Sequence, residues 1–170
     1  MNVIGIVDNT TKDDNSHTLV KVALKYIQTF KYDTRIISAD DFDFSKANPD
    51  SDKLKADLEG ADALILATSA NFPEATTDID PFLQWVDRKG VDLTDKPVGA
   101  MLLIEPRDSI KDIDEDILVK HVKGWKANVV SEVKFTKVAE DNDARSNTYV
   151  LTEAMRCGED IGKYLKKLDK

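Results

Sequence analysis

The feature that most constrains the fold is a run of five apolar residues, Ala63-Leu64-Ile65-Leu66-Ala67. Polar residues do not alternate with apolar ones in this run, which is typical of a strand that is buried on both faces. Such strands form parallel sheets that helices cover on each side. A similar run, Val3-Ile4-Gly5-Ile6-Val7, begins near the first residue. The sequence therefore predicts an α/β protein.

Strands and helices are expected to alternate along the whole chain. The strands are predicted at residues 3–7, 33–38, 62–68, 98–104 and 128–135. The helices are predicted at residues 16–30, 51–59, 78–87, 112–125 and 152–168, where apolar residues recur at helical spacing. This order predicts a single domain over residues 1–170, with a doubly wound five-stranded parallel sheet inside three α/β/α layers.

Three helix starts are predicted from capping residues. Ser51, Asp78 and Thr152 each precede a segment of helical spacing. Side chains of these types accept hydrogen bonds from the free N–H groups of a first turn, so each is expected to cap its helix. Residues 39–50, 69–77, 105–109 and 137–146 are predicted to be loops.

Composition excludes several classes of function. The chain has 24 Lys and Arg against 32 Asp and Glu, which gives a net charge of -8. A nucleic-acid surface needs clustered cations, so nucleic acid is not expected as a partner. No apolar run approaches the length of a membrane span, and the first residues lack the features of a signal peptide, so a cytoplasmic location is expected. The single cysteine, Cys157, falls on an apolar helix face and is expected to be inert.

A ligand site is predicted at the carboxyl ends of the strands. Doubly wound sheets bind ligands there, at the point where the strand order reverses. Three loops, residues 8–15, 69–77 and 105–109, are expected to line this crevice. Ser16, His17 and Thr18 open the first helix, and the N–H groups of a helix N-terminus suit a phosphate. Simple capping of that helix explains Ser16 and Thr18 equally well.

Several segments resemble one known family. Val3-Ile4-Gly5-Ile6-Val7 followed by Asn15-Ser16-His17-Thr18-Leu19 resembles the start of the NADPH-dependent FMN reductase family, which is flavodoxin-like. Residues 62–68, 78–87 and 95–98 resemble that family's third strand, the helix after it and the entry to its fourth strand. The resemblance implies a flavodoxin-like fold, FMN as cofactor, NADPH or NADH as electron donor, and a homodimer. Trp85 and Trp125 are candidates for the subunit contact, although both could instead pack inside the chain.

The resemblance also implies which residues contact the cofactor. They are Asn9, Thr11, Lys12, Ser16, His17 and Thr18 in the first loop and helix, Asn71 and Phe72 after the third strand, and Arg107 after the fourth. The family reads glycine-serine where this chain has Asp8-Asn9, and arginine where it has Thr11. The family's glycine-rich segment falls on residues 105–109, which contain no glycine. The flavin carries the chemistry, so no catalytic side chain and no metal are expected.

The charge of the first loop bears on the choice of function. Asp8, Asp13 and Asp14 have the same sign as a phosphate, unless they are simply solvated loop residues. A carboxylate about 4 Å from a phosphate costs about 1 kcal/mol per unit charge even in water. Two functions therefore stay open. The first is an FMN-dependent NAD(P)H oxidoreductase that passes hydride through the flavin to a small acceptor. The second is a flavodoxin-like relative that has lost the flavin and acts as a binding or interaction protein.

A receiver domain of a response regulator is excluded. Receiver domains use a similar sheet with an acidic pocket after the first strand. They also need a phosphorylatable aspartate at the end of the third strand, where this chain has Thr68-Ser69.

Overall fold

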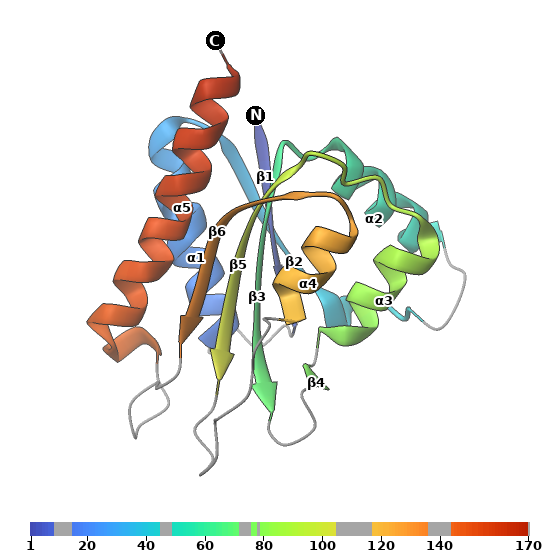
Figure 1. Ribbon diagram of the computed structural model, residues 1–170, viewed down its shortest axis with the longest axis horizontal. Coiled ribbons are helices and arrows are strands. Elements are labelled where there is room, and N and C mark those ends of the chain that lie inside the picture. Colours follow the sequence, from blue (N-terminus) through green and yellow to red (C-terminus); the bar gives the residue numbers. More distant parts are fainter. Residues whose placement is uncertain are drawn as a thin grey trace.

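A computed structural model of the chain describes residues 1–8, 15–44, 49–71, 76–77, 79–104, 117–135 and 144–169. Five parallel strands form the sheet in the order β2-β1-β3-β5-β6 (Figure 1). Their bounds are β1 Asn2–Val7, β2 Asp33–Ser38, β3 Ala63–Asn71, β5 Pro97–Ile104 and β6 Asn128–Phe135. The order reverses between β1 and β3, so the predicted doubly wound sheet is confirmed.

Helices cover both faces of the sheet. One face carries α1 (Asn15–Ile27) and α5 (Thr148–Leu168). The other carries α2 (Pro49–Gly60), α3 (Asp80–Lys89) and α4 (Ile117–Gly124). Short 3-10 turns occupy η1 (Gln28–Phe30), η2 (Ala39–Asp41) and η3 (Ala144–Ser146). The predicted three-layer arrangement is therefore confirmed.

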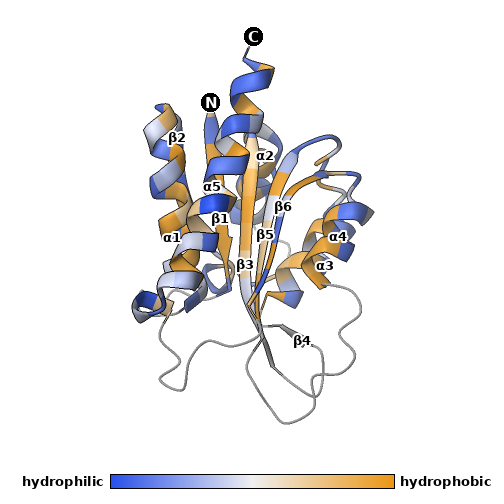
Figure 2. Ribbon diagram, turned by 60° about the vertical axis from the view of Figure 1, so that its left-hand side comes forward, coloured by the Kyte–Doolittle hydropathy of each residue, from blue (hydrophilic) through white to orange (hydrophobic). Residues whose placement is uncertain are grey.

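The sheet separates two hydrophobic clusters, and each strand contributes to both. In β1, Val3 and Val7 face α1 and α5, while Ile4 and Ile6 face the opposite layer. All four side chains are fully buried. Figure 2 shows the matching pattern on the helices, whose hydrophobic sides turn toward the sheet. Burial on two faces explains why the strands read as continuous apolar runs.

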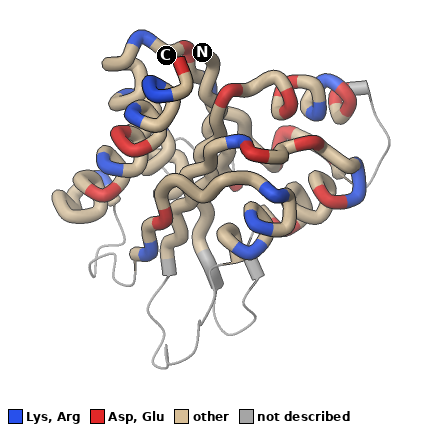
Figure 3. The backbone as a smooth tube through the Cα atoms, turned by 45° about the horizontal axis from the view of Figure 1, so that its top comes forward, with Lys and Arg blue, Asp and Glu red and all other residues tan. Residues whose placement is uncertain are grey.

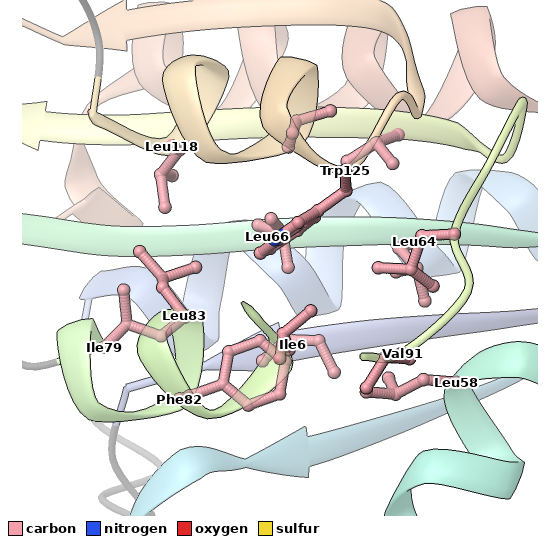
Figure 4. Close-up of a cluster of buried hydrophobic side chains, with 14 of the residues drawn as sticks. Ile6, Leu58, Leu64, Leu66, Ile79, Phe82, Leu83, Val91, Leu118 and Trp125 are labelled. Carbon is pink, nitrogen blue, oxygen red and sulfur yellow. The ribbon is translucent and has the colours of Figure 1, made fainter. Parts of the chain in front are cut away.

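Trp85 and Trp125 pack inside the chain. Both belong to the cluster between the sheet and α3 and α4, with exposed fractions of 5% and 8%. Figure 4 shows Trp125 in this cluster with Leu66 and Leu118. The indole N–H of Trp125 donates to the Asp87 carboxylate at 2.6 Å. Packing within one chain accounts for both rings, which removes them as candidates for a subunit contact.

The helices α1 and α5 pack closely against each other. A Cβ atom added to Gly158 of α5 would stand 2.2 Å from the carbonyl oxygen of Ala23 in α1. Only glycine at this position lets the two helix backbones approach so closely, since atoms at that distance would have to shift. The contact joins the C-terminal helix to the helix that begins beside the predicted ligand crevice.

Two of the predicted helix caps are displaced in the layer that contains α2 and α3. The helix α2 begins at Pro49, so Ser51 lies in the first turn and is buried instead of capping it. The N-cap of α3 is Ile79, which makes no side-chain capping bond. Asp78, the expected cap, lies outside the described residues. Proline in the first turn of each helix lacks the N–H that a cap would satisfy, which reduces the need for one.

The predicted start of the last helix is wrong by one turn. The Asn147 side chain caps α5 by accepting from the N–H of Val150 at 3.2 Å. Thr152 lies inside the helix, and its hydroxyl donates to the carbonyl of Thr148 at 2.7 Å. Threonine hydroxyls inside helices commonly bond back in this way. Asn147 is the stronger N-cap residue and precedes the first inward-facing side chain.

The strand β3 is longer than predicted. It continues to Asn71, where residues 69–77 were expected to form a loop. Its end pairs antiparallel with the two-residue strand β4, Thr76–Thr77. Of the predicted helix at 112–125, the structure describes Ile117–Gly124, and residues 112–116 lie outside the described part.

Charged residues lie mainly on the helices and the connecting segments (Figure 3), where lysine and arginine are interspersed with acidic residues. Among the helices that the structure describes, none is both long enough and apolar enough to cross a membrane.

Cys157 is fully buried between α5 and β5. A Cβ atom on Gly99 of β5 would stand 2.5 Å from its sulfur. Burial raises the pKa of the Cys157 thiol to about 12. A thiol with so high a pKa forms almost no thiolate near neutral pH, so the chemistry of a catalytic cysteine is excluded at this position.

The raised pKa predicts a loss of stability in alkaline solution. Below pH 9 the thiol is protonated in both states, and above pH 9 only the unfolded chain releases the proton. The free energy of unfolding should therefore fall, by up to about 1.4 kcal/mol per pH unit, as the pH rises from 9 toward 12. Urea unfolding gives the free energy of unfolding of wild type and Cys157→Ala at several alkaline pH values. The difference between the pH dependences of the two proteins measures the contribution of Cys157. The same pH dependence in both proteins would contradict a raised pKa of the Cys157 thiol.

Candidate functional site at the strand ends

The candidate site lies where the carboxyl ends of β1 and β3 meet. Val7 of β1 pairs with Ala67 of β3, so the next residues, Asp8 and Thr68, lie side by side. This is the point where the strand order reverses. The arrowheads in Figure 1 place it at the end of the molecule opposite to both termini. Crevices at this position bind the ligands of doubly wound sheets.

A buried carboxylate occupies this point. Asp8 has an exposed fraction of only 4%. It accepts hydrogen bonds from the Ser16 hydroxyl at 2.5 Å, the Thr68 hydroxyl at 2.9 Å and the Ser69 N–H at 3.3 Å. We call Asp8, Ser16, Thr68 and Ser69 the Asp8 cluster. The expectation that Asp8 is a solvated loop residue is therefore wrong.

The Asp8 cluster joins three elements of secondary structure. Asp8 follows β1, Ser16 lies in the first turn of α1, and Thr68 and Ser69 belong to β3. Ser16 and Thr68 are both fully buried. Burying a carboxylate is costly unless donors satisfy it, and bonds to a charged acceptor are stronger than neutral ones. The cluster thus fixes the start of α1 against the ends of two neighbouring strands.

A further contact ties the C-terminal part of the chain to the same corner. The side-chain oxygen of Asn15 accepts from the N–H of Ala144 at 2.8 Å. Ala144 begins η3, which leads into α5. The start of α1 is therefore held both by the strand ends and by the segment before the last helix.

The structure brings together some of the predicted cofactor residues. Ser16, His17 and Thr18 all lie in the first turn of α1, and His17 and Thr18 are half-buried. Asn71 is the last residue of β3. Asn9, Thr11, Lys12, Phe72 and Arg107 lie outside the described residues.

Sequence reasoning missed the partners of Asp8. Thr68 was predicted to end the third strand and Ser69 to begin the loop after it, without a contact to Asp8, and Asn15 was named only in the segment that resembles the family. The sequence did contain a signal, because Asp8 and Thr68 each directly follow a buried apolar run. The carboxyl ends of neighbouring parallel strands meet at one edge, so the two side chains could have been expected to bond.

A flavin phosphate fits only part of this arrangement. The 13-residue helix α1 has no acidic residue in its first turn, and its N-terminus suits an anion. However, Ser16 in this first turn donates its hydroxyl to the Asp8 carboxylate. Two like charges about 4 Å apart repel by about 1 kcal/mol in water and by about 4 kcal/mol in a partly dried site. The described residues therefore do not form a good site for a phosphate dianion.

No metal centre is visible in the described part of the chain. Its His, Cys, Asp and Glu side chains do not form any group of three or more that could hold a metal ion.

Comparison with known proteins places this geometry in context. The family model described as NADPH-dependent FMN reductase matches residues 1–139. Flavodoxin 2 from Bacillus cereus is similar in structure, with a TM-score of 0.69 and 11% identity over 96% of this chain and 99% of that chain. A flavodoxin, WrbA-like protein from Agrobacterium tumefaciens has a TM-score of 0.65 and 13% identity, with 98% of each chain covered.

The rubredoxin oxygen:oxidoreductase from Desulfovibrio gigas has a TM-score of 0.70 and 13% identity. The match covers 98% of this chain but only 36% of that protein. These identities are low, so the solved structures establish the flavodoxin-like fold and nothing finer. No significant match was found among curated protein sequences.

The Asp8 cluster predicts a specific loss of stability. Thr68→Val keeps the shape of the side chain but removes a donor to a buried carboxylate, which should lower the free energy of unfolding by about 1–3 kcal/mol. Thr152→Val is the matched control, because Thr152 is exposed in α5, and it should change stability by less than about 0.5 kcal/mol. Urea unfolding of both variants decides the matter. Equal losses in the two would show that Asp8 does not depend on Thr68.

Proposed function

Because the chain belongs to the NADPH-dependent FMN reductase family, we propose that it is a flavin-dependent oxidoreductase. It takes hydride from NADPH or NADH and passes the electrons to a small acceptor. The observation that carries the proposal is the extent of the family match. Residues 1–139 include every strand of the sheet and all three strand ends of the crevice.

The arrangement of the strand ends supports a flavin site. In a flavin enzyme the bound flavin supplies the hydride-accepting chemistry, while the protein binds and orients it. The residues of this chain are suited to that task. The Asp8 cluster fixes α1 against β1 and β3, and Asn15 fixes the segment before α5 on the same corner. Such a rigid corner holds a ligand in one orientation without any side chain acting as acid or base.

Flavin binding and NAD(P)H oxidation test the proposal together. FMN or riboflavin added to the purified protein should show a shifted absorbance spectrum and quenched fluorescence on binding. Under anaerobic conditions NADPH or NADH should then bleach the flavin faster with the protein than without it. Serum albumin at equal concentration controls for non-specific effects.

Binding of neither flavin, with no acceleration of bleaching, would contradict the proposal. The buried, internally bonded Asp8 would then favour the second function, a flavodoxin-like protein that has lost its cofactor and acts by binding a partner.

A further inference from the structure

We infer that the flavin site of this chain binds riboflavin at least as tightly as FMN, because the buried Asp8 carboxylate is bonded to the first turn of α1, the helix N-terminus that would otherwise suit a phosphate. The inference rests on the proposed function and deepens it. Asp8 is then a specificity-determining residue, because it lowers the affinity for a ligand with a terminal phosphate.

The hydroxyl groups of Ser16 and Thr68 both donate to Asp8. A serine or threonine hydroxyl has a single proton to donate. The proton of Ser16 is directed to one carboxylate oxygen of Asp8, and the proton of Thr68 to the other. A phosphate in this corner would meet hydroxyl lone pairs in place of donors. Two side chains that look suited to phosphate binding are thus engaged in binding an internal anion.

Backbone N–H groups at this corner also donate to side chains of the protein. The N–H of Ser69 is directed to the Asp8 carboxylate, and the N–H of Ala144 to the Asn15 side chain. Two backbone donors at the corner are therefore also turned toward side chains of the protein itself. Because Asp8 is only 4% exposed, solvent does little to screen its charge.

The two flavins differ in the group that ends the ribityl chain. A phosphate dianion can only accept hydrogen bonds near neutral pH, and it is repelled by the carboxylate. The ribityl hydroxyls of riboflavin are neutral and can both donate and accept. They can therefore bond to carboxylate and hydroxyl oxygens alike. The chemistry of the corner favours a flavin that ends in a hydroxyl over one that ends in a phosphate.

The experiment compares the two flavins on three proteins by isothermal titration. Wild type should bind riboflavin with a dissociation constant equal to or below that of FMN. Asp8→Asn keeps the shape of the side chain and removes the charge, so it should raise the affinity for FMN relative to riboflavin about tenfold, or about 1.4 kcal/mol. Asp33→Asn is the matched control, since Asp33 is exposed at the first residue of β2, at the far end of the sheet. It removes the same charge and should leave the ratio unchanged.

Salt provides a second measurement that needs no variant. Raising the ionic strength from about 0.01 M to about 0.15 M shortens the screening length from about 30 Å to about 8 Å, but it screens a buried charge much less than an exposed one. Because Asp8 is only 4% exposed, the ratio of the two affinities in the wild type should persist at the higher ionic strength. A ratio that shifts toward FMN with added salt would mean that exposed charges, and not Asp8, cause the preference. A tenfold preference of wild type for FMN, or an unchanged ratio in folded Asp8→Asn, would overturn the inference alone. Binding of neither flavin would overturn the proposed function as well.

Discussion

The hydrogen-bonded carboxylate of Asp8 is the interaction on which the functional end of this molecule depends. It lies at the junction of β1, β3 and α1, and it is held by two buried hydroxyls and a backbone N–H. A carboxylate can be buried at such a point only because these donors replace the water that it loses. The same bonds fix the start of α1 against the ends of β1 and β3.

The fold determines where a ligand can bind, and the residues at that position determine which ligand it can be. A sheet buried on both faces leaves only the strand ends and the helix termini free to contact a ligand. In this chain the two hydrophobic clusters are continuous along the sheet, so the strand ends are held by a well-packed core. Membership of a flavin-reductase family gives the general chemistry. Asp8 is one of the positions at which this chain differs from the general pattern of that family, and it is the one whose contacts the structure describes.

Much of the fold could be predicted from the sequence, because a strand that is buried on both faces is a continuous run of apolar residues. The runs at Val3–Val7 and Ala63–Ala67 gave the two central strands and hence the reversal point. Helix starts were less predictable, since Asn147, Thr148 and Thr152 can all serve as caps and only packing of α5 decides among them. The contact of Asp8 with Thr68 was missed although it follows from the pairing of β1 with β3, which places the ends of the two apolar runs side by side. Of the predicted cofactor residues, Ser16, His17 and Thr18 do share one turn beside the crevice.

The central claim is that a flavin binds at the strand ends beside Asp8. Backbone hydrogen exchange, measured with and without saturating riboflavin, tests it most directly. The account predicts slower exchange in the first turn of α1 and at the end of β3, with no change at the amino ends of the strands, such as Asp33 in β2. Unchanged exchange at α1 and β3, or protection confined to another part of the molecule, would contradict it.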